Sequence, residues 1–332
     1  MLWGFCLPSR DVKLKLRQLA PLLLAILSLA LVLGIEVTSN WFPRLDFFQR
    51  LKWMTYDWRV KQASQWPSPA SEDLGVINIG DETIAFFSDG RLGSNYTYGL
   101  YWPRHLYAQV IRELGAQGAK WVGVDVLFGE RRRDYDRLLI PLPRQNQALP
   151  SDAFFQYNLG ELGNVVLGAT AEVPPHRIFR VAAADMGDIS VDTDADGVFR
   201  RIQPFKNYRI WHDEIRLEAL LNGWNLDQAQ VLSNAVLIPR PDQTPVRIPV
   251  EDGFFNPAIF KTNPGTDPPP MEQAYQDLRV WHLGIVLAAK AIGLDLEQAK
   301  VELNRRRILL PGTNGIERIL PLDAKGCLLI DW

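Results

Sequence analysis

Residues 120–128 have the sequence Lys-Trp-Val-Gly-Val-Asp-Val-Leu-Phe, an apolar run that is typical of a strand buried inside a sheet. A helix is predicted just before it, over residues 102–118, because Pro103 suits a first helical turn and apolar side chains then recur at helical spacing. Residues 74–79 form another short apolar run and predict an earlier buried strand. Strand, helix and strand in this order make a crossover connection, so the two strands should run parallel.

Further elements are expected along the rest of the chain, and no internal repeat is recognised. Strands are predicted at 164–170, 307–311 and 327–330, a hairpin at 187–191 and 198–205, helices at 214–221 and 281–292, and short strands with long loops over 222–277. The expected fold is therefore α/β, with a mixed, partly parallel sheet and flanking helices, preceded by one N-terminal transmembrane helix.

The composition excludes several classes of function. The chain has 332 residues, of which 47% are hydrophobic and 22% charged, as in ordinary globular proteins. Its net charge of -2 gives no general attraction for nucleic acid, so no nucleic-acid partner is expected. Its two cysteines and four scattered histidines show no metal-binding spacing, so no cofactor is expected.

The N-terminal region contains a candidate membrane anchor. No charged residue occurs from Gln18 to Ile35, and a helix of this length reaches about 27 Å, close to the thickness of a bilayer core. A cleaved signal peptide is the alternative, but its apolar region is usually shorter and ends in an Ala-x-Ala-like site, which the segment does not have. The prediction is a transmembrane helix over residues 19–37, after a cytoplasmic tail of residues 1–18.

Basic residues before the segment set its orientation. Arg10, Lys13, Lys15 and Arg17 precede it, so the N-terminus should stay in the cytoplasm. The chain is therefore expected to be a single-pass protein of the cell (inner) membrane whose main domain, residues 73–332, is extracytoplasmic.

Residues 38–72 are expected to form a juxtamembrane helix and linker. The side chains of Phe47, Leu51, Met54 and Trp58 fall on one face of a helix. Such a face could pack on the domain. Aromatic residues of this region could also lie at the level of the lipid headgroups; these are Trp41, Phe42 and Trp53.

Five blocks, in order along the chain, resemble one known family. They are Tyr56-Asp-Trp-Arg59, Ile77-Asn-Ile-Gly-Asp81, Trp102-Pro-Arg104 with the block 118–128, Asp194-Ala-Asp-Gly-Val-Phe-Arg-Arg201, and the block 308–332. From about residue 45 to the end, the chain is similar to the second type of CHASE domain, a bacterial extracytoplasmic sensory module.

This resemblance implies a role in signal input without catalysis. Members of the family typically lie upstream of adenylate or diguanylate cyclases, histidine kinases or serine/threonine kinases, so the expected partners are an unknown small-molecule ligand, the membrane, and such an output protein or a second copy of the chain. The family usually continues into further transmembrane helices and an output domain. Because the sequence stops at Trp332, it is expected to be a standalone sensor or part of a longer receptor.

A ligand site is expected at one edge of the sheet, since ligands of open α/β sheets lie beyond the carboxyl ends of parallel strands. The candidate residues are Asp81, Glu82, Arg104, Asp125, Asp134 and Asp136. Three interpretations remain open. Asp125 could simply pair with Arg104 or cap a loop, the cleft could bind a polar ligand or a cation, or paired carboxylates could catalyse hydrolysis. Besides the sensor, the alternatives are thus an envelope protein–protein interaction module and a carboxylate-dependent hydrolase.

The carboxylates of Asp192, Asp194 and Asp196 form a weak candidate calcium site, because their spacing matches the opening of an EF-hand loop. That loop needs a glutamate at its twelfth position, which here is Gln203. A hairpin turn of Asp and Gly is the preferred interpretation.

Overall fold

The computed structural model describes residues 21–31, 33–34, 46–66, 72–91, 98, 101–142, 146–241, 243–260 and 270–330. The chain divides into two compact units, residues 1–77 with 331–332, and residues 78–330. The predicted cytoplasmic tail, together with Trp41 and Phe42, lies outside the described residues.

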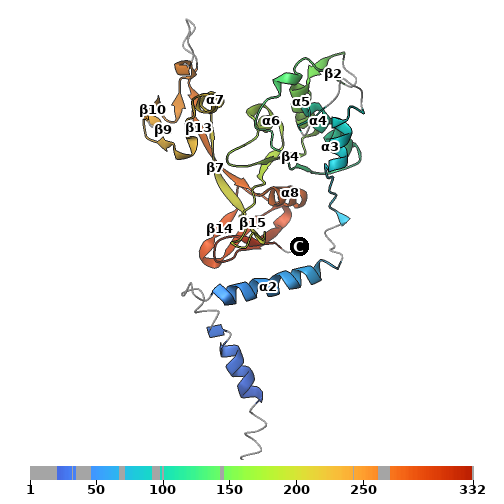
Figure 1. Cartoon of the computed structure of the whole chain (residues 1–332), viewed down its shortest axis with the longest axis vertical. Helices are drawn as coiled ribbons and strands as arrows, with labels where there is room; N and C mark the ends of the chain where they lie inside the picture. Colours follow the sequence, from blue (N-terminus) through green and yellow to red (C-terminus); the bar gives the residue numbers. More distant parts are fainter. Residues whose placement is uncertain are drawn as a thin grey trace, which may run out of the picture. The chain divides into compact units, whose positions relative to one another are not determined.

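The described residues of the first unit are mainly helical. Residues 21–31 are helical, and α2 covers Asp46–Ala63, where the amphipathic pattern predicts a helix (Figure 1). In the part of the chain that the structure describes, no helix combines the length and the apolar character needed to span a membrane. Residues 19, 20, 32 and 35–37 of the predicted transmembrane segment are not among the described ones.

The second unit is built on a parallel three-stranded sheet. Its strands are β1 (Val122–Val124), β4 (Val165–Ala169) and β5 (Asp185–Asp188), in the order β1-β4-β5. All five residues of the central strand β4 are buried, which explains its uninterrupted apolar sequence. The crossovers contain α5 (Ser151–Leu162) and α6 (Arg177–Ala182).

The strand predicted at 74–79 is wrong. These residues form no strand, and Leu74, Val76 and Ile77 are exposed to 69%, 83% and 63%. The parallel partner of β1 is instead β4, which follows it in the chain. A short apolar run does not by itself show whether its side chains become buried, and here the pattern misled the prediction.

Helices cover both faces of this sheet. On one face, the buried core joins α4 (Arg104–Ala116), α5 and α6 to the sheet through Ile111, Phe155 and Phe179. On the other face lies α8 (Leu283–Ile292), whose approach requires glycines in the strands. A Cβ added at Gly123 would stand 2.5 Å from Leu287, and one at Gly187 would stand 2.5 Å from the backbone of Leu283.

The remaining elements are short. They are α3 (Asp81–Ser88), η3 (Arg133–Tyr135) and the antiparallel pair β2 (Leu139–Pro141) and β3 (Ala148–Pro150). Beyond β5 come β6 (Arg201–Ile202), β11 (Phe254–Phe255), η5 (Pro257–Phe260), β12 (Glu272–Gln273), η7 (Thr313–Gly315) and β17 (Leu328–Leu329). The hairpin predicted at 187–191 and 198–205 is not formed, because β5 pairs with β4 and β6 pairs with β17.

Two similar lobes follow the parallel sheet. Strands β7 (Phe205–Trp211) and β13 (Tyr275–Trp281) pair antiparallel, and each leads into a helix, α7 (Asp213–Asn222) or α8. A three-stranded antiparallel sheet then follows in each lobe. In the first lobe the sheet follows η4 (Leu226–Gln228) and consists of β8 (Gln230–Val231), β9 (Ala235–Arg240) and β10 (Gln243–Pro249). In the second lobe it consists of β14 (Lys300–Glu302), β15 (Arg307–Pro311) and β16 (Glu317–Pro321), with η6 (Leu303–Arg305) between β14 and β15.

These lobes are an internal repeat, so the prediction of none was wrong. Residues 205–231 and 275–301 align at a constant offset of 70, with eleven of the 27 positions identical, too many to be coincidental in segments of the same structure. The shared His212 and His282 each cap a helix, and the shared Gly223 and Gly293 end it with φ of 66° and 72°. Beyond these segments, the second lobe has two more residues than the first between its first and second sheet strands, in the region of η6. This insertion changes the offset and hides the similarity of β9 to β15 in the sequence.

The repeat relates the two lobes by an approximate twofold axis through their shared ribbon. Tyr208 of β7 pairs with Leu278 of β13, and these two residues are equivalent in the repeat. The first lobe (residues 211–260 and 272–275) and the second lobe (201–205 and 281–330) lie at opposite ends of this ribbon (Figure 1). Each lobe has its own buried core, around Phe255 in the first and Trp281 in the second.

Candidate functional site

The predicted ligand-site residues are only partly brought together. Asp81 and Glu82 lie exposed in the first turn of α3. Asp125 follows β1 and Asp134 lies in η3, and both are also exposed. Arg104 and Asp136 are the members that lie in a common, partly buried environment, linked through Arg131 and Asp152.

Arg104 is the buried centre of that environment. It begins α4, is 6% exposed, and donates from a guanidinium nitrogen to the carbonyl oxygen of Glu130 at 3.2 Å. Its guanidinium carbon lies 4.7 Å from the centre of the Phe128 ring, within the range of a cation–π interaction. Burial, followed by the nearby charge of Arg132, lowers the pKa of Arg104, although an arginine stays protonated at any physiological pH.

Asp152 faces this arginine from the start of α5. Its side chain is 1% exposed, and one carboxylate oxygen accepts a hydrogen bond from the backbone N–H of Arg132 at 2.8 Å. The side chain of Arg131 lies 3.6 Å from the same oxygen and 3.8 Å from Asp136. The sequence prediction missed Asp152, although an aspartate in the first turn of a helix after Pro150 is a usual helix-start signal.

Aromatic rings form a wall around these charges. The Trp102 ring makes tilted contacts with Phe87 and Tyr107, with ring centres 4.5 and 5.8 Å apart, and Tyr107 meets Phe128 edge to face at 5.3 Å between ring centres. Tyr98 and Tyr135 continue the wall with a contact at 5.9 Å. We call Trp102, Arg104, Phe128, Asp136 and Asp152 the Arg104 cluster.

The Arg104 cluster holds most of the unsatisfied buried polar side-chain atoms of the described residues. Four of six such atoms belong to it: two donors, Trp102 Nε1 and Arg104 Nε, and two acceptors, an oxygen of Asp136 and one of Asp152. Buried polar atoms in folded proteins nearly always have a hydrogen-bond partner, because leaving one unmade costs about 1–3 kcal/mol. This concentration makes the Arg104 cluster the candidate site for a polar ligand or ordered water.

A second polar network lies at the carboxyl end of β5. The buried carboxylate of Asp188 accepts hydrogen bonds from the hydroxyls of Tyr208 and Ser190, both at 2.6 Å. Lys206 donates to Ser190 at 2.6 Å and lies 3.3 Å from Asp192. Burial and the bond to Asp188 raise the pKa of Tyr208.

A Ser–Lys contact can mark a nucleophile and its base, but this one has a structural role. The Ser190 hydroxyl donates to Asp188, and Lys206 lies between the carboxylates of Asp188 and Asp192. The network therefore ties β5 to β7 rather than activating the hydroxyl.

The weak calcium site is occupied by arginine side chains instead. The guanidinium of Arg200 makes two hydrogen bonds to Asp196, at 2.9 and 2.7 Å, and one to Asp194 at 3.2 Å. The guanidinium of Arg201 forms ion pairs with Asp194 at 3.0 Å and with Asp323 at 3.1 Å, and so links these two aspartates. The bonds from Arg200 lower the pKa of Asp196 to about 2. Among the described residues, no group of three or more His, Cys, Asp or Glu side chains is placed to hold a metal ion.

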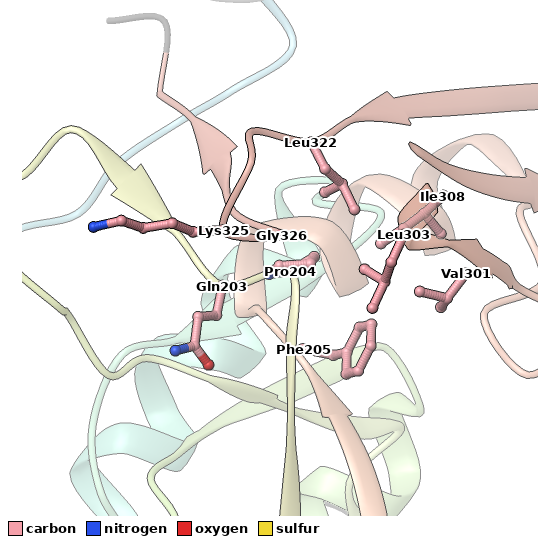
Figure 2. Close-up of a pocket in the computed structure, with 9 residues that line it drawn as sticks. All are labelled: Gln203, Pro204, Phe205, Val301, Leu303, Ile308, Leu322, Lys325 and Gly326. Carbon is pink, nitrogen blue, oxygen red and sulfur yellow. The ribbon is translucent and has the colours of Figure 1, made fainter. Parts of the chain in front are cut away.

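Two surface hollows lie away from the predicted residues. One, of about 250 Å³, opens in the second lobe and is lined mainly by apolar side chains, including Phe205, Leu303 and Leu322. Figure 2 shows that the amine of Lys325, at its edge, points away from these side chains. The other, of about 370 Å³, lies on the ribbon beside Tyr208 and Asp277. Neither contains a buried polar atom without a partner, so the Arg104 cluster is the stronger candidate.

Comparison with known families decides the classification. The family model of the CHASE2 domain matches residues 24–260. The chain belongs to the CHASE2 domain family. This match confirms the resemblance predicted from the sequence. CHASE2 domains are sensory extracellular domains. No curated protein and no solved structure matches the chain.

The CHASE2 match covers the central sheet, the Arg104 cluster and residues 211–260 of the first lobe. It ends at Phe260, so the second copy of the repeat lies outside it. The residues of the second copy nevertheless complete the fold, because α8 covers one face of the CHASE2 sheet.

Proposed function

We propose that this CHASE2 chain is a membrane-anchored, extracytoplasmic, non-catalytic input domain of a bacterial signalling system, and that the Arg104 cluster binds its ligand. The observation that carries the proposal is the set of four buried polar atoms without hydrogen-bond partners. We infer binding rather than catalysis because Arg131, Asp136 and Asp152 lie in mutual ion pairs.

The chemistry of the cluster suggests the class of ligand. Two donors and two acceptors lie beside aromatic rings, so a small molecule that offers both hydrogen-bond donors and acceptors, such as a zwitterion, fits better than a simple anion. Ligand pockets of this kind place a few polar groups within an aromatic lining. The ligand would change signalling only if it binds one conformational state of the domain more tightly than another.

Membrane anchoring rests on the N-terminal residues. In the helix at 21–31, Leu22 to Leu24, Ile26, Leu27, Leu29 and Leu31 are all exposed, as expected of a segment that faces lipid. The proposed layout is a cytoplasmic tail (1–18), a transmembrane helix (19–37), a juxtamembrane region (38–72) and an inner-membrane-anchored external domain (73–332). The proposed output partner is a cyclase, a kinase or a second copy of the chain.

A thermal-shift screen tests the ligand site. The full chain in detergent is screened against small polar metabolites, and a ligand that binds the native state raises its melting temperature. Trp102→Phe keeps an aromatic side chain but removes the Nε1 donor, so it should abolish the ligand-induced shift. Because the smaller ring leaves a gap at this buried position, the ligand-free variant should melt at a lower temperature, and the shift is measured against that temperature. The exposed Arg318→Gln serves as the control.

A ligand whose shift persists in both Trp102→Phe and Asp136→Asn would place the site elsewhere. Turnover of a screened compound that is lost in Asp125→Ala without unfolding would favour the hydrolase alternative.

A docking module is the second candidate, and one observation favours it. On α7, Leu217, Leu220 and Leu221 are 49%, 73% and 69% exposed. The equivalent of Leu217 in the second lobe, Leu287, packs against the parallel sheet. If α7 instead binds a second copy of the chain, the purified protein should be dimeric by light scattering, and Leu220→Gln with Leu221→Gln should make it monomeric.

A further inference from the structure

The ribbon of β7 and β13 has one buried face and one open face. The side chains of Tyr208, Ile210 and Val280 belong to the buried cluster that also contains Ala169 of the parallel sheet. Successive side chains of a strand alternate between its two faces, so the neighbours of these residues lie on the other side of the ribbon. The central side chains of that open face are polar and exposed; they are Asn207, Arg209, Asp277 and Arg279.

The repeat arranges these four residues as two equivalent pairs. Arg209 lies opposite Asp277 in the ribbon, and Arg279 lies opposite Asn207. At the offset of 70, Arg209 is equivalent to Arg279, and Asn207 is equivalent to Asp277. The approximate twofold axis therefore exchanges the two pairs. They differ in one group, because the carboxylate of the first pair is replaced by a neutral carboxamide in the second.

In the first pair, the guanidinium binds the carboxylate through two hydrogen bonds. The Nε and Nη2 atoms of Arg209 donate to the two carboxylate oxygens of Asp277, both at 2.7 Å. These bonds lower the pKa of Asp277, so the arginine stabilises the charged form of a carboxyl group at this position. The guanidinium carbon of Arg209 also lies 4.8 Å from the centre of the Tyr275 ring.

In the second pair, the guanidinium is held by a ring in the same way but has no carboxylate. The guanidinium carbon of Arg279 lies 4.7 Å from the centre of the Phe205 ring, and Phe205 is equivalent to Tyr275 in the repeat. Among the residues that the structure describes, no acidic side chain lies within ion-pair distance of Arg279. Stacking on a ring orients the guanidinium in advance, so less entropy is lost when it binds an anion.

We propose that Arg279 and Asn207 bind the carboxylate group of a small organic acid, at the position equivalent to that of the Asp277 carboxylate in the first pair. Arg279 offers a planar fork of N–H donors that matches a carboxylate, and the Asn207 amide offers a further donor. The hollow of about 370 Å³ on the ribbon is lined by Asn207, Arg209 and Asp277, and it gives space for the rest of the acid.

Two reciprocal substitutions test this site in the full chain in detergent. Asn207→Asp puts a carboxylate of the chain itself into the second pair, and Asp277→Asn removes the carboxylate of the first pair. Binding is measured by saturation-transfer NMR with propionate and succinate, and with propionamide as the uncharged control. The site is separate from the Arg104 cluster, so its failure would leave the proposed function unaffected.

The parent chain should transfer saturation to both acids but not to propionamide. Asn207→Asp and Arg279→Gln should each weaken the binding of the acids about tenfold, because the first occupies the site and the second removes its charged donors. Asp277→Asn releases the equivalent Arg209, so it should add a second site and raise the signal. The exposed Arg318→Gln removes a positive charge elsewhere in the second unit and should leave the signal unchanged.

The melting temperature of Asn207→Asp separates lost binding from unfolding. This variant should melt no lower than the parent chain, because its new carboxylate can pair with Arg279 as Asp277 pairs with Arg209. Saturation transfer that persists in Arg279→Gln or in Asn207→Asp would overturn the inference, as would a parent chain that binds neither acid. An unchanged signal in Asp277→Asn would also overturn it, because the two pairs would then not be equivalent.

Discussion

Histidine side chains act as helix caps at three places in this domain. His176, His212 and His282 each accept a hydrogen bond at Nδ1 from the backbone N–H two residues later, at 3.2–3.3 Å. A nitrogen that accepts must be unprotonated, so all three caps require a neutral imidazole or at least a bare Nδ1. For His176 and His282, which cap α6 and α8, this requirement links the start of the helix to pH.

Mild acid should destabilise the domain. Burial lowers the pKa of His176 and His282 below the ordinary value of 6.5, so the unfolded chain binds more protons as the pH falls through 6.5. The stability should be full above this pH, decline below it, and level off once the folded histidines protonate. Denaturant unfolding between pH 7.5 and 5 would measure the decline.

His282→Asp is the matched variant, because aspartate also caps a helix but does not titrate in this range. Its stability should depend less on pH than that of the parent chain. An unchanged pH dependence would show that other groups cause the effect.

Tyr208→Phe tests the buried network at β5. The change removes the hydroxyl that donates to Asp188 at 2.6 Å and leaves a carboxylate that is 1% exposed with one bond fewer. The expected loss is about 2 kcal/mol of unfolding free energy, since an unsatisfied buried acceptor costs roughly 1–3 kcal/mol. Denaturant unfolding measures it, and a loss below about 0.5 kcal/mol would show that the bond is replaced by solvent.

The repeated helices α7 and α8 have different roles despite similar sequences. Helix α8 covers the parallel sheet, where Leu287 lies over Gly123, whereas the equivalent Leu217 of α7 is 49% exposed. One structural element thus serves as core packing in one lobe and as surface in the other.

Leu287→Ala and Leu217→Ala form a matched pair that measures this difference. Leu287→Ala should cost about 2–4 kcal/mol, because it removes packing beneath the sheet, and Leu217→Ala should cost less than about 1 kcal/mol. Equal losses in thermal or denaturant unfolding would contradict the different burial of the two helices.

Across the whole second unit, the chain crosses between the lobes twice. It leaves the second lobe through β7, forms the first lobe, and returns through β13. Neither lobe is a continuous piece of sequence, although the family match ends between the two copies.

A chain that ends at Phe260 should therefore fail to fold cooperatively. It would lack β13, the partner of β7, and α8, which covers the sheet at Gly123 and Gly187. We expect a broad thermal transition and binding of a hydrophobic dye. A sharp transition like that of the full chain would show that the region matched by the family folds without the second copy.

The local patterns of the sequence predicted several elements well. The helix at α4 and the strands β1 and β4 follow from apolar patterns and helix-boundary residues that act within a few positions, and helices were also predicted where α7 and α8 lie. In the candidate site, Arg104 and Asp136 were predicted, because charged residues beside a predicted sheet edge are visible locally.

The sequence alone determined the family, the α/β class and the positions of most helices, because these depend on local residue patterns and their order. Only the tertiary structure decided which strands pair, that two segments 70 residues apart share one ribbon, and that Asp152 lies beside Arg104. The physical reason is that strand partners and buried ion pairs are chosen by long-range packing, and residues far apart in the chain carry no local sign that they will meet.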